Sequence, residues 1–254
     1  MRAHYPSLAG RAVVITGGAS GIGGAIVWDF VRQGARVAFL DKDAVAGKAL
    51  CEKIASSNLI APMFVECDLV DIPSLRAGLQ RIERELGPAA VLVNNAACDQ
   101  RQQFAELTEQ EFDWMIAVNL RHVVFAAQAI APQMQSLGYG SIINLTSVAW
   151  MRGVVDVQAY SAAKAGIVGF TNSLARQLGG SRIRVNAVAP GLVLTERQRE
   201  KWFSDKERIA ASMAPQAIPD PIEPADVSAL VMFLAADDSR MLTKQCICVN
   251  AGSL

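Results

Sequence analysis

The sequence has few histidines and few charged side chains for its length. Its 254 residues include two histidines, His4 and His122, and 19% of the chain is charged. Two histidines argue against a histidine-rich metal site and leave little room for a Ser-His-Asp triad. We therefore expect no bound metal.

An excess of charge of either sign is also missing. The 24 Lys and Arg residues balance the 24 Asp and Glu residues, so the formal net charge is +0. Proteins that bind nucleic acid are normally basic, so we expect no nucleic-acid partner. The apolar fraction of 52% is ample for a large buried core and argues against a disordered chain.

Cysteine is scarce, and so are long apolar runs. The cysteines are odd in number, and their spacing fits neither a disulfide framework nor a CxxC metal site. No charged-then-apolar leader opens the chain, and no run of about 18 apolar residues is present. We therefore expect a reduced, soluble, cytoplasmic protein without membrane contact. The cysteines, interpreted as small core residues, are Cys51, Cys67, Cys98, Cys246 and Cys248.

The sequence does contain an alternation of short β-rich runs and amphipathic stretches. Several of the runs are apolar almost throughout, which is typical of a parallel sheet covered on both faces. Ser74–Leu86 carries apolar residues at a period near 3.6, as an amphipathic helix does. No linker or internal repeat interrupts the pattern, so it predicts one doubly wound α/β domain over residues 1–254. The predicted strands are Arg11–Thr16, Arg36–Leu40, Pro62–Cys67, Ala90–Val93, Ser141–Leu145, Arg182–Val188 and Gln245–Val249.

A glycine-rich turn, TGGASGIG over Thr16–Gly23, follows the first predicted strand. Gly17 allows the tight turn, Gly21 lets the backbone approach a pyrophosphate, and Gly23 permits close packing of helix on strand. The start of the following helix offers free N–H groups and a partial positive charge to an anion. The turn therefore predicts a dinucleotide site.

Asp41 ends the second predicted strand. A carboxylate at this place accepts hydrogen bonds from the adenosine ribose hydroxyls and repels a 2′-phosphate. The early turn Gly18–Ser20 holds no Arg or Lys, and Lys42 is the nearby cation. We therefore predict NAD in preference to NADP. The alternative for Asp41 alone is an exposed acid at a strand end.

Polar side chains also follow the third and fourth predicted strands. The carboxylate of Asp68 would accept a hydrogen bond from an adenine amino group. The paired amides Asn94 and Asn95 would tie neighbouring strands together and line the adenosine ribose. Both positions lie on the edge where open α/β sheets bind ligands.

Tyr160 and Lys164 open a long predicted helix with a spacing of i, i+4. Residues so spaced lie on one helical face. A neighbouring cation favours the phenolate, so we expect Lys164 to lower the pKa of Tyr160 from about 10 toward neutrality, with an oxidised nicotinamide adding further positive charge. Such a tyrosine takes a proton from an alcohol or returns it to a carbonyl. The YxxxK pattern alone also occurs by chance.

Two further polar residues complete the predicted chemistry. Ser147 ends the fifth strand, where its hydroxyl would hydrogen-bond the reacting oxygen. Asn119 falls in the middle of a predicted helix, although asparagine is a poor helix former. We interpret it as holding a water that links Lys164 to solvent; the alternatives are a helix kink or a surface polar residue.

Together these residues resemble the short-chain dehydrogenase/reductase family over essentially the whole chain. The resemblance implies seven parallel strands in the order 3-2-1-4-5-6-7 and nicotinamide-dependent hydride transfer. It implies a catalytic set of Asn119, Ser147, Tyr160 and Lys164. The residues that carry it are Thr16–Gly23, Asp41, Asp68, Asn94, Asn95, Ala96, Asn119, Ser147, Tyr160, Lys164, Pro190, Gly191 and Thr195.

The same resemblance implies further contacts. Lys164 would hold the nicotinamide ribose, Thr195 with Val193 would meet the carboxamide, and a homotetramer would form on the helices around Asn119–Leu137 and Tyr160–Leu178. The chain departs from the family at Lys244, where glycine usually precedes the last strand. The expected cofactor contacts are Gly17, Ser20, Gly21, Ile22, Gly23, Asp41, Asp68, Leu69, Asn95, Ala96, Tyr160, Lys164, Pro190, Gly191, Val193 and Thr195.

The segment Glu196–Arg208 stands out because nine of its 13 residues are charged. We interpret residues 192–215 as a substrate flap, with Trp202 and Phe203 as its apolar face. The alternative is a solvated helix.

Short matches at Tyr5–Leu8, Asn119–His122, Gln128–Pro132 and Thr195–Trp202 resemble bacterial sugar dehydrogenases of this family, for aldoses and for deoxy-keto-sugar acids. An aromatic face with acids and amides suits a polyhydroxylated ring. Arg101 or Arg152 would pair with a substrate carboxylate, or would be a surface arginine. His122 is expected at the surface or a subunit contact. The candidate substrate residues are Arg101, Ser147, Trp150, Arg152, Asp156, Gln198 and Trp202.

These observations predict an NAD-dependent dehydrogenase that acts on a sugar or sugar acid. A 3-oxoacyl or other carbonyl reductase is the alternative enzyme. A redox-sensing NAD-binding protein is the alternative without turnover, although such a sensor need not retain Ser147, Tyr160 and Lys164.

Overall fold

A computed structural model describes residues 3–196, 198 and 205–254. Its seven strands form one parallel sheet in the order β3-β2-β1-β4-β5-β6-β7, which confirms the predicted fold. Each strand lies within two residues of its predicted bounds. The strands are β1 Ala12–Thr16, β2 Arg36–Asp41, β3 Met63–Glu66, β4 Val91–Asn94, β5 Gly140–Leu145, β6 Ile183–Pro190 and β7 Cys246–Val249.

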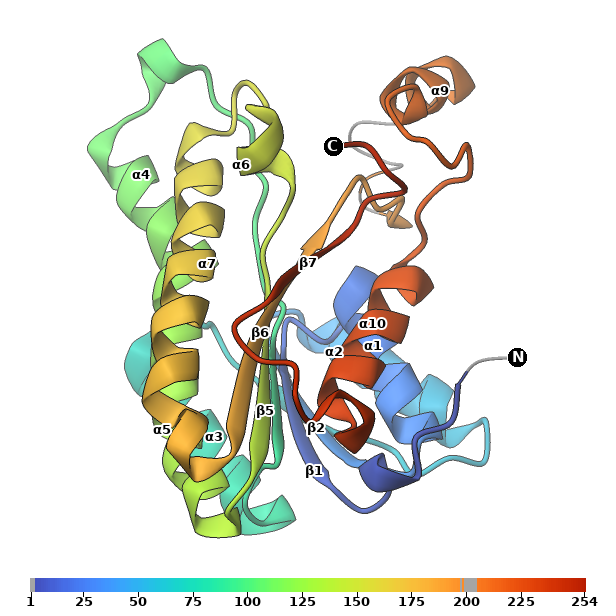
Figure 1. Ribbon diagram of the computed structural model, residues 1–254, viewed down its shortest axis with the longest axis vertical. Coiled ribbons are helices and arrows are strands. Elements are labelled where there is room, and N and C mark those ends of the chain that lie inside the picture. The colour runs from blue at the N-terminus through green and yellow to red at the C-terminus, as the bar shows by residue number, and fades with distance from the viewer. Residues whose placement is uncertain (1–2, 197, 199–204) are drawn as a thin grey trace.

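Helices cover both faces of the sheet (Figure 1). One layer holds α3 Ile72–Leu86, α5 His122–Leu137 and α7 Gln158–Leu178; the other holds α1 Gly21–Arg32, α2 Ala44–Ala55 and α10 Pro224–Ala235. Each layer closes a separate core: Val13 and Ile15 of β1 pack into one, and Val14 into the other. Burial on both faces explains why the central strands are mostly apolar.

Shorter elements connect these layers, and some of them flank the carboxyl ends of the strands. There, α6 and α9 stand on opposite sides of the sheet (Figure 1). The shorter elements are η1 Pro6–Leu8, η2 Phe104–Glu106, α4 Glu109–Ile116, η3 Ala117–Arg121, α6 Ala149–Arg152, η4 Gly179–Ser181, α9 Lys206–Met213 and η5 Asp237–Ser239.

One helical stretch bears on the expectation that the protein makes no membrane contact. Glu109–Leu137 forms 29 continuous helical residues that are long and apolar enough, by length and composition alone, to cross a membrane. Core helices of soluble proteins pass the same test. Ala126, Ile130 and Met134 pack into the core on their side of the sheet, so part of this apolar character is used inside the protein.

Candidate active site

The glycine-rich turn lies between β1 and α1, at the carboxyl edge of the sheet. Gly17 and Gly21 have φ angles of 67° and 54°, which favour glycine. A Cβ at Gly17 would lie 2.6 Å from Ala96 Cα, and one at Gly23 would lie 1.9 Å from the Gly17 oxygen. There is therefore no room for a side chain at Gly17 or at Gly23. The amides at the start of α1 form a cradle suited to a pyrophosphate.

Asparagine side chains lock the strand ends around this cradle. Asn95 Nδ2 donates to the oxygens of Gly17 at 2.8 Å and Thr16 at 3.2 Å. Asn94 Nδ2 donates to Asn144 Oδ1 at 2.8 Å. The two amides tie β1, β4 and β5 together, as the sequence predicts.

Asp41 lies against the same turn. One carboxylate oxygen accepts from the Ala19 amide at 3.0 Å and the other from the Asp43 amide at 3.1 Å. The side chain is half-buried, whereas Lys42 is exposed. A carboxylate fixed beside the cradle fits the ribose hydroxyls of an adenine dinucleotide.

The remaining expected cofactor residues border the same edge. Asp68 is exposed and accepts from the Val70 amide at 3.0 Å, while Leu69 is buried. Val193 forms a bridge with Ile222. A Cβ at Gly21 would lie 3.3 Å from Thr195 Cγ2, so Thr195 faces the cradle. Ser20, Ile22, Ala96, Pro190 and Gly191 belong to the turn or to the ends of β4 and β6.

Ser147, Tyr160 and Lys164 lie together where β5 meets α7. Lys164 Nζ lies 5.6 Å from the Tyr160 ring centroid and donates to the Leu145 oxygen at 2.8 Å. Thr146 Oγ1 donates to the Lys164 oxygen at 2.6 Å. A side-chain hydrogen bond joins Ser147 to Tyr160. The end of β5 therefore positions the helix that carries the tyrosine and the lysine.

The acid–base balance of the pair differs from the prediction. Burial raises the pKa of Tyr160 to about 12, with the Ser147 hydrogen bond opposing this shift and the charge of Asp99 adding to it. Burial lowers the pKa of Lys164 to about 7, against the opposing charge of Asp99. The expected lowering of the Tyr160 pKa by Lys164 is therefore wrong for the protein alone: desolvation of the phenolate is the largest cause of the shift, and Lys164 is not among its causes.

Asn119 lies in the π-helical segment η3, not in a regular helix. Its Oδ1 accepts from the Cys98 amide at 2.9 Å, and its Nδ2 donates to the oxygens of Cys98 and Met115 at 3.0 Å each. The side chain thus fixes the loop after β4. Both of its N–H donors go to backbone oxygens, so its side-chain amide is used within the protein rather than to hold a water.

His122 corrects another expectation. The sequence predicts a surface or subunit contact, but the side chain is 0% exposed. Burial and the nearby charge of Lys164 lower its pKa to about 3, while backbone groups of Ala117 and Val118 oppose this shift. The imidazole is therefore a neutral core group at neutral pH.

The candidate substrate residues divide by exposure. Ser147, Trp150, Asp156 and Gln198 are half-buried, whereas Arg101 and Arg152 are exposed. Trp202 and Phe203, the expected apolar face of the flap, lie outside the described residues.

Asp99 was missed by sequence reasoning. Its Oδ2 accepts from Gln198 Nε2 at 2.5 Å. Asp99 could have been found from its place in the loop after β4, two residues before Arg101, which was the candidate substrate residue of that loop. The sequence analysis expected Arg101 or Arg152 to supply the charge beside the substrate. Both arginines are exposed, whereas Asp99 is half-buried, so the charge there is negative rather than positive.

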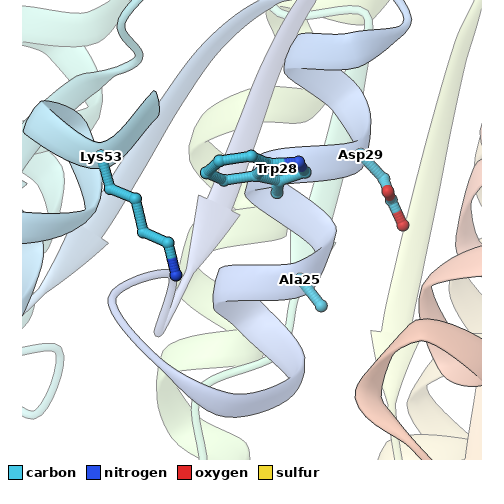
Figure 2. Close-up of a pocket in the computed structure, with 4 residues that line it drawn as sticks. All are labelled: Ala25, Trp28, Asp29 and Lys53. Carbon is cyan, nitrogen blue, oxygen red and sulfur yellow. The ribbon is translucent and has the colours of Figure 1, made fainter. Parts of the chain in front are cut away.

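Figure 2 shows a hollow lined by Ala25, Trp28, Asp29 and Lys53, on α1 and α2. Lys53 Nζ lies 5.8 Å from the Trp28 ring centroid, and Asp29 Oδ2 accepts from Ser228 at 2.7 Å. Trp28 is two helical turns, roughly 10 Å, along α1 from the cradle. The hollow is therefore separate from the candidate site.

Known proteins resemble the chain over nearly its full length. Residues 17–253 match the family described as "Enoyl-(Acyl carrier protein) reductase". The "Probable galactose dehydrogenase GalD" of Rhizobium meliloti (strain 1021) is 45% identical over 249 residues, 98% of this chain and 97% of that protein. The D-xylose 1-dehydrogenase of Caulobacter vibrioides is 45% identical over 250 residues, 98% of each chain.

A third relative is more distant. The D-threitol dehydrogenase of Mycolicibacterium smegmatis is 32% identical over 248 residues, 96% of this chain and 93% of that protein. Full-length similarity agrees with the strand order, the cradle and the grouping of Ser147, Tyr160 and Lys164. The chain belongs to the short-chain dehydrogenase/reductase family of nicotinamide-dependent oxidoreductases.

Proposed function

We propose that this protein is an NAD-dependent sugar dehydrogenase that oxidises the hemiacetal or a secondary hydroxyl of a neutral sugar. The grouping of Ser147, Tyr160 and Lys164 beside the dinucleotide cradle carries the proposal. Two relatives that are 45% identical over nearly the whole chain are named for galactose and D-xylose, which supports the substrate class. Their names give the best first substrates to try.

In this proposal each residue has a separate task. In its phenolate form, the oxygen of Tyr160 takes the proton of the substrate hydroxyl as the hydride leaves the C–H bond, and a carbonyl forms. Ser147 donates a hydrogen bond to the reacting oxygen. Lys164 would hold the nicotinamide ribose, and its charged form together with the positive charge of the oxidised nicotinamide would favour the phenolate over the neutral phenol. When bound, the nicotinamide supplies the acceptor for the hydride.

The preference for NAD rests on Asp41. The carboxylate is held by two backbone amides beside the cradle, so it has little freedom to move away from a 2′-phosphate.

We further propose a cytoplasmic homotetramer built on α5 and α7. The exposed Phe112 and Trp114 of α4, 41% and 37% exposed, support association on this side of the sheet.

The first test is a panel of neutral aldoses, sugar acids and keto-deoxy acids with NAD, followed by reduced-nicotinamide absorbance. We expect D-galactose or D-xylose to be turned over. Tyr160→Phe should lose at least about 100-fold in kcat, because the general acid–base group is removed. Binding of NADH, measured by fluorescence, should stay within about twofold because the ring and Lys164 remain.

Tyr139→Phe is the matched control. Tyr139 is 38% exposed and packs against Arg11, away from the site, so the same loss of a hydroxyl should leave turnover unchanged. Retained turnover in Tyr160→Phe would refute the mechanism. Turnover of acyl thioesters with NADPH in place of sugars would support a carbonyl reductase, and inactivity across the panel a redox sensor.

A further inference from the structure

Asp99 lies where two parts of the candidate site meet. It is half-buried in the loop after β4. Its charge acts on both members of the catalytic pair: it opposes ionisation of Tyr160 and favours the protonated form of Lys164. The carboxylate therefore lies near enough to influence the charge state of both side chains.

The backbone on both sides of Asp99 is held in place. Before it, Cys98 is bound through its amide and its oxygen by Asn119, at 2.9 and 3.0 Å. After it, the Gln102 amide donates to the Asp156 oxygen at 2.9 Å, just before α7. The carboxylate is therefore carried on a short loop anchored to the elements that bear Asn119 and Tyr160. Side chains fixed in this way suit selective recognition.

The carboxylate also reaches the segment that follows β6. Asp99 Oδ2 accepts from Gln198 Nε2 at 2.5 Å, and the Gln198 amide donates to Thr195 Oγ1 at 3.2 Å. Thr195 in turn faces Gly21 of the cradle. This series of contacts leads from the neighbourhood of Tyr160 to the cofactor side. Asp99 and Gln198 thus present an acceptor and an amide together.

Building on the proposed sugar dehydrogenase, we propose that Asp99 determines specificity by accepting hydrogen bonds from a substrate hydroxyl near the reacting carbon, with Gln198 as its amide partner. An ionised carboxylate accepts hydrogen bonds and donates none. It therefore strengthens binding of a substrate that has a hydroxyl at this place, weakens binding of an analogue that lacks that hydroxyl, and repels a substrate carboxylate. The enzyme selects neutral polyhydroxylated substrates over sugar acids.

The test combines substrate variants with Asp99→Asn, which keeps the shape of the side chain and removes its charge. kcat/KM is measured for D-galactose, its monodeoxy derivatives and D-galacturonate. In the wild type, removal of the hydroxyl that meets Asp99 should cost roughly 10- to 100-fold. In Asp99→Asn that penalty should fall below about threefold, and the galacturonate-to-galactose ratio should rise at least about tenfold.

Gln198→Ala is the matched control because it breaks the hydrogen bond but keeps the carboxylate. It should retain most of the deoxy penalty. Wild-type sugar turnover without any monodeoxy penalty above about threefold overturns the inference alone, and needs no variant to fold. So does an Asp99→Asn loss that is equal for every substrate, which indicates a structural role. If the wild type turns over no sugar, the proposed function fails as well.

Discussion

At the scale of single residues, Lys164 is a charged side chain that folding buries almost completely. It is 2% exposed and donates to a backbone oxygen, and burial lowers its pKa from 10.5 to about 7. Burying an ammonium costs free energy of folding, although the reaction uses this lysine beside Tyr160. Catalytic sites commonly sacrifice stability in this way.

Lys164→Met should therefore abolish turnover yet unfold at higher urea than the cofactor-free wild type, by about 1–3 kcal/mol at pH 6.5. Below pH 7 the lysine is charged in both states, so its full burial cost is present. Between pH 7 and 10.5 the folded state releases the proton while the unfolded state keeps it, so the cost falls as pH rises. The advantage of the variant should shrink at pH 9.5, and a variant less stable at both pH values would contradict this account.

Asp41 is the residue that we expect to determine the preference for NAD over NADP. Asp41→Ser should raise the NADP-to-NAD ratio of kcat/KM by roughly 100-fold, because a carboxylate facing a 2′-phosphate costs several kcal/mol. Steady-state kinetics with both cofactors measure the ratio. Asp43→Ser is the control: Asp43 caps α2, and serine caps as well, so the ratio should not move. An unchanged ratio in Asp41→Ser would remove the basis for the NAD preference.

At the scale of elements, the sheet was predictable and the helix irregularity was not. Strands buried on both faces are continuous apolar runs, and their ends moved by two residues or fewer because turn residues mark them. The π-helical segment at Asn119 was not predicted, because its insertion depends on the contacts of that side chain with Cys98 across 21 residues of chain. The pattern of apolar residues within one helix does not predict a contact with a residue so far away in the sequence.

The same limit applies to the site. Glycines, Asp41 and the Tyr160–Lys164 pair were predictable because their spacing follows from strand and helix geometry. Asp99 and the burial of His122 were not, since each depends on which distant elements pack around it. The raised pKa of Tyr160 reflects burial, which spacing alone does not give.

The turn before β7 carries a strained residue. Lys244 has a φ of 64°, and its amide donates to the Val185 oxygen at 2.7 Å. A left-handed conformation costs a residue with a side chain about 1–2 kcal/mol, part of which glycine loses again through the entropy of the unfolded chain. Lys244→Gly should stabilise the protein by about 0.5–1 kcal/mol in urea unfolding. Lys244→Ala keeps the strain, so an equal gain in that control would contradict the explanation.

At the scale of the whole molecule, the two cores on either side of the sheet enclose polar groups as well as apolar ones. His122 and Lys164 are both buried, and the charge of the lysine further disfavours a charged imidazole. The charge states of these two side chains near the site therefore affect the free energy of unfolding of the whole protein. Lowering the pH tests this for His122, because acid favours the charged imidazole that burial disfavours.

The pKa of His122 falls from 6.5 to about 3 on folding, so the unfolded state binds a proton that the folded state refuses. Above pH 6.5 both states are neutral, and His122 has no effect on the pH dependence. As pH falls below 6.5, stability should drop by about 1.4 kcal/mol per unit. Urea unfolding at pH 7 and 4.5 should show about 2–3 kcal/mol more loss in the wild type than in His122→Gln.

The comparison rests on the slope with pH, so a general destabilisation by the substitution does not affect it. His4→Gln, the same substitution at an exposed position, is the control and is measured at the same two pH values. Equal slopes in the wild type and His122→Gln would mean that the imidazole is hydrated or protonated in the folded state, contrary to its burial.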